Sequence, residues 1–119
     1  EMDKLLSWFC LKNVPGIGNH LFKRLIDRFN LPEVVFQASR KELLEVEGIS
    51  KRQSAAILNY KVPQSIKAEL DQANHKGYKI ITLTDSSYPP LLREIPDPPP
   101  FLYVSGSLDG SPKNIAVVG

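Results

Sequence analysis

Two short glycine-containing segments are the parts of this sequence best suited to binding a ligand. Residues 14–18 read Val-Pro-Gly-Ile-Gly, and residues 46–50, thirty-two positions later, read Val-Glu-Gly-Ile-Ser. A glycine lets the backbone adopt a positive φ and approach a ligand closely. A helix that starts beyond such a turn presents unpaired amides with a partial positive charge, and these bind a phosphate without reading its base. The pattern therefore predicts contact with phosphate groups.

Both segments have the form of a helix-hairpin-helix motif. Ser50 stands in the later copy where the earlier copy has its second glycine. Two copies at the same place between helices indicate an internal duplication, and basic residues accompany each copy. The residues that we predict to contact a DNA backbone are Gly16, Ile17, Gly18, Lys23, Arg24, Gly48, Ile49, Ser50, Lys51 and Arg52.

The same pattern fits two αα-hairpin turns that serve only packing. Glu47 lies inside the second turn and would repel a phosphate, and Ser50 departs from the motif. From the residues alone, DNA contact and a purely structural role both stay open. In either case we expect Ile17 and Ile49 to fill the core between their helices.

The charge of the chain is too mild to indicate nucleic-acid binding by itself. The net charge is +2 over 119 residues, whereas most phosphate binders concentrate basic residues more heavily. Residues 1–62 carry ten Lys or Arg against seven Asp or Glu, and residues 63–119 carry five against six. The weak basic bias therefore belongs to the N-terminal half.

The composition is that of a soluble globular protein, with 42% apolar and 24% charged residues. No apolar run approaches the roughly 20 residues that span a bilayer, and no secretory segment follows the charged start. Cys10 is the single cysteine, and it lies in an apolar stretch. We expect a buried thiol in a reducing environment, a cytoplasmic protein and no membrane partner.

Helical periodicity dominates the first half of the chain. It predicts five short helices, at about 3–11, 19–29, 32–37, 39–45 and 50–60. Pro32 suits the first position of a helix, and Ser39 with Glu42 has the Ser-x-x-Glu form of a capping box. In the last of these helices we expect residues 55–58 to supply the core side.

The periodicity changes after a longer helix that begins at Pro63 and ends at Gly77. Residues 79–83 are β-branched and predict a strand, and Pro90 starts one helical turn. Residues 96–100 must be extended because each proline fixes its own φ, and the apolar residues on both sides favour a packed segment over a disordered linker. Residues 115–118 are typical of a fully buried parallel strand, followed by Gly119 at the start of a phosphate loop.

Residues 88–106, YPPLLREIPDPPPFLYVSG, and residues 115–119, IAVVG, resemble the entry to the core domain of the DprA/Smf family. The resemblance covers the whole chain. It implies a mainly α fragment: a tandem helix-hairpin-helix, SAM-like helical domain followed by the first strands of a truncated α/β Rossmann-like domain. The expected limits are 1–62 for the helical domain, 63–77 for a connecting helix and 78–119 for the N-terminal fragment of the extended Rossmann-like domain.

The resemblance also implies a function. Members of the family bind single-stranded DNA and load a RecA-type recombinase onto it during natural transformation. The resemblance places the main DNA pocket, the recombinase contacts and the contacts of a homodimer in a part of the core domain beyond Gly119. For the helical domain it leaves contact with DNA and contact with another protein partner open.

The residue patterns give little support to the hypothesis that the protein is an enzyme. His20 and His75 lack the spacing of metal ligands, and Asp85, Ser86 and Ser87 fit ordinary turn chemistry. A nucleotide-binding Rossmann enzyme would need a complete Gly-x-Gly-x-x-Gly, of which only the first glycine is present. We therefore expect no catalytic residue, no metal and no cofactor. The remaining alternative is a SAM-like protein-interaction module without DNA binding, which salt-dependent DNA affinity would distinguish.

Overall fold

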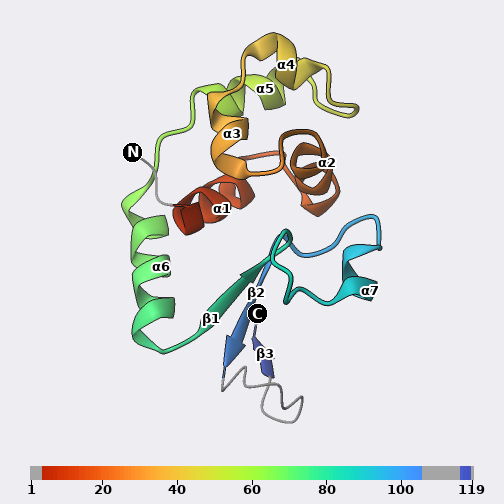
Figure 1. Cartoon of the computed structure of the whole chain (residues 1–119). Helices are drawn as coiled ribbons and strands as arrows, with labels where there is room; N and C mark the ends of the chain where they lie inside the picture. The colour runs from red at the N-terminus through yellow and green to blue at the C-terminus, as the bar shows by residue number, and fades with distance from the viewer. Residues whose placement is uncertain (1–3, 106–115, 119) are drawn as a thin grey trace.

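The computed structural model describes residues 4–105 and 116–118. The helices are α1 (Lys4–Asn13), α2 (Asn19–Phe29), α3 (Pro32–Gln37), α4 (Arg40–Leu44), α5 (Lys51–Leu58), α6 (Gln64–His75) and α7 (Pro90–Arg93). The strands are β1 (Lys79–Thr82), β2 (Phe101–Ser105) and β3 (Ala116–Val118). Helices α1 to α5 lie above the sheet in Figure 1, with α6 on one side and α7 on the other. This confirms the prediction of a mainly α fold with a few strands. Across the described residues, no helix has the length and apolar character needed to cross a membrane.

Local signals in the sequence set the starts of several helices. Pro32 is the first residue of α3, and Ser39 and Glu42 form the predicted capping box of α4. The hydrogen bond from the Ser39 amide lowers the pKa of the Glu42 carboxyl, because it stabilises the ionised form. Gly77 has a φ of +77° just after α6, as expected of a residue that ends a helix. All five helices predicted before residue 62 are present.

The expectation that residues 55–58 supply the core side of α5 is wrong for Leu58. Ile57 is buried, but Leu58 is 41% exposed. Four consecutive apolar residues cannot all face inward on a helix with 3.6 residues per turn. The buried side of α5 is formed by Ile57 and Ser54, which are one turn apart.

The strands form one antiparallel sheet in the order β1-β2-β3. Ile81 of β1 lies opposite Leu102 of β2, and Val104 of β2 lies opposite Val117 of β3. The sequence correctly predicted a strand near residues 115–118, which is β3. The prediction that this strand is parallel is wrong, because β3 pairs with β2 in antiparallel orientation. Parallel neighbours need a crossover of about a dozen or more residues, usually with a helix, and only residues 106–115 separate these two strands.

The proline-rich segment before β2 is packed, as predicted. Pro98 and Pro100 are buried, and the buried Tyr88 donates its hydroxyl hydrogen to the Pro99 carbonyl at 2.7 Å. Arg93 donates from Nε to the Leu83 carbonyl at 3.0 Å. Arg93 also donates from Nη2 to the carbonyl of Asp85 at 2.7 Å. Pro99 is therefore tied to Tyr88, and Arg93, which precedes the prolines, is tied to the turn after β1.

Aromatic contacts join the helical half to the sheet. The rings of Phe9 in α1 and Phe101 in β2 are stacked, with centroids 4.6 Å apart. The Lys12 ammonium lies 5.0 Å from the centroid of the Phe101 ring, and Lys23 donates to the Ile95 carbonyl at 3.5 Å. The buried residues of both halves form one continuous cluster. The sheet therefore contacts the helical half through α1, which lies directly above it in Figure 1.

Candidate nucleic-acid interface

The two glycine turns have the same backbone conformation. Gly16 has a φ of +87° and Gly48 a φ of +93°, so both occupy the left-handed region that other residues rarely adopt. The matching bonds are Val14 N to Leu11 O and Ile17 N to Val14 O, at 3.2 Å each, and Val46 N to Leu43 O and Ile49 N to Val46 O, at 3.1 Å each. The duplication that the sequence predicted is therefore present in the hydrogen bonds of the turns.

Contacts between the two copies follow the same thirty-two-residue offset. Asn13 donates to the Tyr60 hydroxyl at 3.0 Å, and the residues at the equivalent positions, Glu45 and Arg28, form an ion pair at 3.5 Å. Each turn glycine also faces the second helix of the other copy. A Cβ on Gly16 would meet Gln53, and a Cβ on Gly48 would meet Leu21, which is the equivalent position. The first hairpin (α1, residues 14–18, α2) and the second hairpin (α4, residues 46–50, α5) thus pack reciprocally.

The isoleucines of both turns point into the core. Ile17 and Ile49 are each 7% exposed, which confirms that they fill the space between their helices. Val14 and Val46, three positions earlier, are buried as well. Contact of these segments with a ligand is therefore left to main-chain atoms and to the exposed residues of the turns, such as Pro15 and Ser50.

The second helix of the first hairpin begins without a side-chain cap. Gly18 is the N-cap of α2, with a φ of −83° and a ψ of 179°, and no side chain accepts a hydrogen bond from the first amides. A Cβ on Gly18 would meet nothing within 4 Å. The helix is eleven residues long, so its partial positive charge is well developed at this end. The start of α2 is open to an anion.

The second helix of the second hairpin begins differently. The Ser50 hydroxyl accepts from the Gln53 amide at 3.3 Å, and Gln53 Oε1 accepts from the Ser50 amide at 2.8 Å. This reciprocal capping box satisfies two of the amides that would otherwise be free. The start of α5 is therefore less available to a ligand than the start of α2.

Gln53 also connects the two hairpins, a role that the sequence did not predict. Its Nε2 donates to the Gly16 carbonyl at 3.1 Å, while its Oε1 stays in the capping box. The Ser-x-x-Gln pattern was a usable signal for the cap. No local pattern indicates the bond to Gly16, because the partners are thirty-seven residues apart.

The four basic residues singled out from the sequence fall into two pairs. Arg24 Nη1 donates to the Glu47 carbonyl at 2.9 Å and lies 3.8 Å from the Glu47 carboxylate. Lys23 donates to the Ile95 carbonyl, as described above. These two hold parts of the protein together. Lys51 and Arg52 are exposed, and within the described part of the chain neither forms an ion pair. Of the four predicted residues, these are the two that are free to meet a phosphate.

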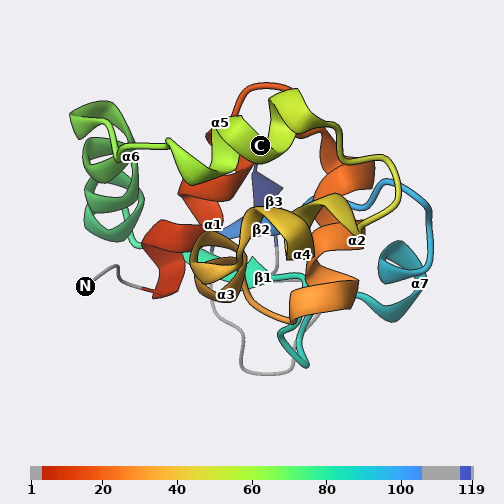
Figure 2. The ribbon, with the colours of Figure 1, turned by 90° about the horizontal axis from the view of Figure 1, so that it is seen from above.

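Two surface grooves accompany the hairpins. The first has a volume of about 630 Å³ and is lined by Pro15, Gly16, Ser50, Arg52, Gln53 and Ala56. The second has a volume of about 400 Å³ and is lined by Arg24, Asp27, Arg28, Glu45, Val46 and Glu47. In Figure 2 the turn between α4 and α5 (yellow) lies beside α2, at the edge away from α6. The first groove carries one charge, which is positive, and the second carries two positive and three negative charges.

The other reactive side chains of the described residues lie in the core, in a turn or on the surface. Burial raises the pKa of the Cys10 thiol, which is fully buried beside Tyr60, so the reactive thiolate is disfavoured. Asp85 accepts from the Ser87 amide at 2.8 Å, which is the turn chemistry predicted for it. His20 and His75 are exposed, and over residues 4–105 and 116–118 no cluster of three or more His, Cys, Asp or Glu is placed to hold a metal ion. The predicted role of Gly119 falls on a residue outside the described part of the chain.

Residues 79–119 match the family model of DNA recombination-mediator protein A. Over 117 residues the chain is 34% identical to Protein Smf of Synechocystis sp., a match that covers 94% of this chain and 29% of that protein. The chain is also similar to two proteins named UvrABC system protein C. It is 45% identical to the one from Natronomonas pharaonis over 47 residues, or 40% of this chain and 8% of that protein. It is 37% identical to the one from Neisseria meningitidis serogroup B over 60 residues, or 50% of this chain and 10% of that protein. The chain thus spans less than a third of the length of the curated relatives it matches.

Proposed function

Because this chain belongs to the DNA recombination-mediator protein A (DprA/Smf) family, we propose that its paired hairpins bind the sugar-phosphate backbone of single-stranded DNA. The observation that carries the proposal is the open start of α2 beside a turn glycine, with the free cations Lys51 and Arg52 at the start of α5. Backbone amides and basic side chains are the groups that proteins use to hold phosphates. The role is binding and not catalysis.

The wider role follows from the family and concerns the longer protein. We propose that a homodimeric, cytoplasmic DNA-processing protein binds incoming single strands and assists a RecA-type recombinase in natural transformation. In that protein the hairpins are the accessory DNA contact, because a site with two free cations, on a chain of net charge +2, supports only weak binding. Contacts of this kind do not read sequence, so we expect sequence-independent affinity.

Titration of a labelled, unstructured oligonucleotide with the whole chain tests the proposal. Lys51→Glu combined with Arg52→Glu should abolish the fluorescence anisotropy change seen at low salt, because it replaces both free cations with repelling carboxylates. In the unchanged protein the affinity should fall as salt rises, because phosphate contacts release bound counterions.

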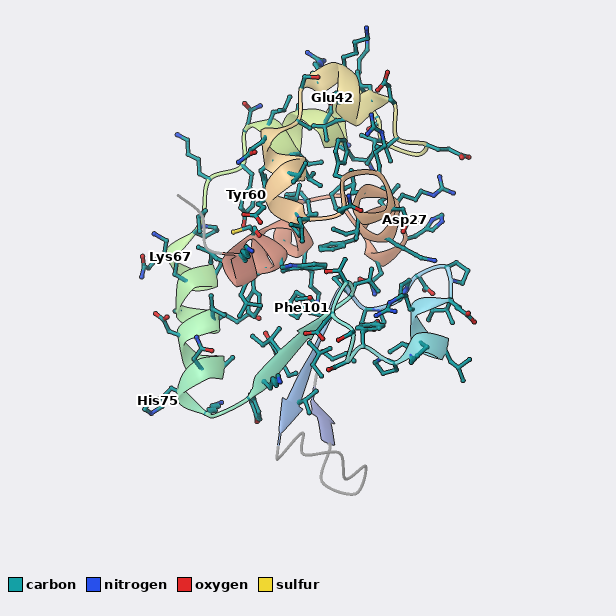
Figure 3. All side chains as sticks on the ribbon, in the orientation of Figure 1. Asp27, Glu42, Tyr60, Lys67, His75 and Phe101 are labelled. Atoms are coloured by element: carbon teal, nitrogen blue, oxygen red, sulfur yellow. The ribbon has the colours of Figure 1, made fainter. Side chains whose placement is uncertain are left out.

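A matched pair of substitutions controls for net charge. Lys67 and Lys76 are exposed on or next to α6, and Figure 3 shows Lys67 on the side of the molecule opposite Asp27 of α2. Lys67→Glu with Lys76→Glu changes the net charge equally and should leave most of the binding intact. If both double variants lose the same affinity, the effect is one of overall charge and the hairpins are not the site.

The alternative function is a SAM-like protein-interaction module. Three large apolar side chains of the helical half are exposed, namely Val34 at 39%, Leu44 at 37% and Leu58 at 41%. Exposed apolar residues support protein contact when they gather in one patch. If the unchanged chain binds no oligonucleotide at low salt, the phosphate function is lost and this second function takes its place.

A further inference from the structure

The groove between the first turn and α5 has the volume of a ligand site. Its volume of about 630 Å³ lies within the range of about 300–1,000 Å³ that small-molecule sites occupy. A phosphate group alone would leave most of such a space empty. The groove therefore fits a larger group attached to a phosphate.

The lining of the groove combines an apolar wall with one cation. The Pro15 ring and the Ala56 methyl group supply apolar surface, and Arg52 is the one charged residue among the six that line it. A guanidinium matches the geometry of a phosphate. An apolar wall beside a cation is complementary to a nucleotide, which carries a flat base next to an anion.

Two polar side chains hold the shape of the groove. Gln53 is held at the groove by its bonds to the Gly16 carbonyl and the Ser50 amide. Its amide group carries two hydrogens, and the bond to Gly16 uses one of them. The second hydrogen and the Ser50 hydroxyl are available to acceptors on a base, and every base has acceptors.

The second groove has lost this complementarity. Its lining carries three carboxylates against two guanidinium groups, and its cations are engaged with Glu45 and Glu47. A phosphate would meet a net negative surface there. The two halves of the duplicated structure have therefore diverged, and only the first groove suits a nucleotide.

We propose that the groove between residues 14–18 and α5 holds one nucleotide of a bound DNA strand. Its base lies against Pro15 and Ala56, and its phosphate contacts Arg52. This inference rests on the proposed function and extends it, since it requires contact with a base as well as with the backbone. A base that enters the groove must leave a duplex stack, which costs a few kcal/mol, so the site favours single strands.

Two strands of equal charge test this directly on the unchanged chain. One is an oligo-deoxythymidine, and the other has the same length and backbone but carries no bases. A site that holds a base should bind the oligo-deoxythymidine roughly tenfold more tightly at the same salt, because base contacts of this kind contribute on the order of 1–3 kcal/mol. Equal affinities for the two strands would overturn the nucleotide site and leave the backbone-binding function standing. No binding to either strand would overturn both.

A substitution that fills the groove provides a second test. Ala56→Phe should lower affinity for the oligo-deoxythymidine by about the same factor, with no change for the strand without bases. Ala68→Phe, at an exposed position on α6, should change neither affinity and serves as the control. If Ala56→Phe weakens binding to both strands equally while the melting temperature is unchanged, the groove does not distinguish bases and the proposal is wrong.

Discussion

The two hairpins have the same backbone, yet their second helices begin with different chemistry. In the first hairpin Gly18 leaves the amides of α2 open, while in the second Ser50 and Gln53 close those of α5 with a capping box. In the second turn the Glu47 carbonyl accepts a hydrogen bond from the Arg24 side chain. In the first turn the Gly16 carbonyl accepts a hydrogen bond from the Gln53 side chain. A repeated fold therefore does not imply a repeated function, because the cap residue decides whether a helix start is available to a ligand.

The largest effect is expected from the turn glycines. Gly16→Val and Gly48→Val should each lower stability by about 2 kcal/mol, because a left-handed backbone costs a residue with a Cβ roughly 1–2 kcal/mol and a β-branched residue more. Gly48→Val should be the worse of the two, since its Cβ would lie 2.8 Å from Leu21 Cδ2 and force that side chain to move. Urea denaturation followed by circular dichroism measures both.

Gly18→Val is the matched control, because Gly18 has a negative φ and an added Cβ would meet nothing within 4 Å. It should cost clearly less than either turn substitution. If the three variants were equally stable, the left-handed backbone would not be what the turns require. If melting were unchanged but DNA binding weaker, the turn glycines would serve only the approach of a ligand.

A smaller effect on stability is expected from substitutions of Gln53. Two variants distinguish its hydrogen bond in the capping box of α5 from its hydrogen bond to Gly16 in the first hairpin. Gln53→Leu removes both bonds and gives this position the residue that stands at the equivalent Leu21, so it should cost about 1–2 kcal/mol. Gln53→Glu can still accept from the Ser50 amide but cannot donate to Gly16. The difference in unfolding free energy between the two variants measures the cap. A Gln53→Glu variant as stable as the unchanged chain would show that the link between the hairpins contributes nothing.

The smallest effect on stability is expected from giving the first hairpin the cap of the second. Gly18→Ser should raise stability by a few tenths of a kcal/mol, because the extended backbone at this residue already suits a serine cap. The new hydroxyl would occupy an amide of α2, so DNA affinity should fall even though the protein is more stable. Anisotropy and urea denaturation on the same sample check both signs. Unchanged affinity in a stabilised variant would mean that the amides of α2 do not bind DNA.

The sequence predicted the features that depend on neighbouring residues. Pro32, the box formed by Ser39 and Glu42, and the left-handed Gly77 each act within one helical turn, and all three are where the pattern placed them. The two hairpins were found for a similar reason, because the pattern Val-x-Gly-Ile at a repeated offset is visible without any knowledge of the fold.

Features that depend on distant residues could not be predicted. The bonds from Gln53 to Gly16 and from Arg24 to Glu47 join positions far apart in the chain, so Arg24 was predicted to contact DNA although it holds the second turn. The direction of β3 was wrong because an apolar run of this length shows that a strand exists but not which neighbour it pairs with. DNA contact by the predicted site residues remains a proposal.

Amide chemical shifts during a titration with oligo-deoxythymidine test the asymmetry of the two hairpins most directly. We predict that the largest changes occur at Gly16 to Leu21 and at Arg52, and that the amides of Glu47, Gly48 and Ile49 change little. The open start of α2 and the free guanidinium would then be the contacts, with the second turn as their support. Equal or larger changes at Glu47 to Ile49, or no change in either hairpin, would contradict this account.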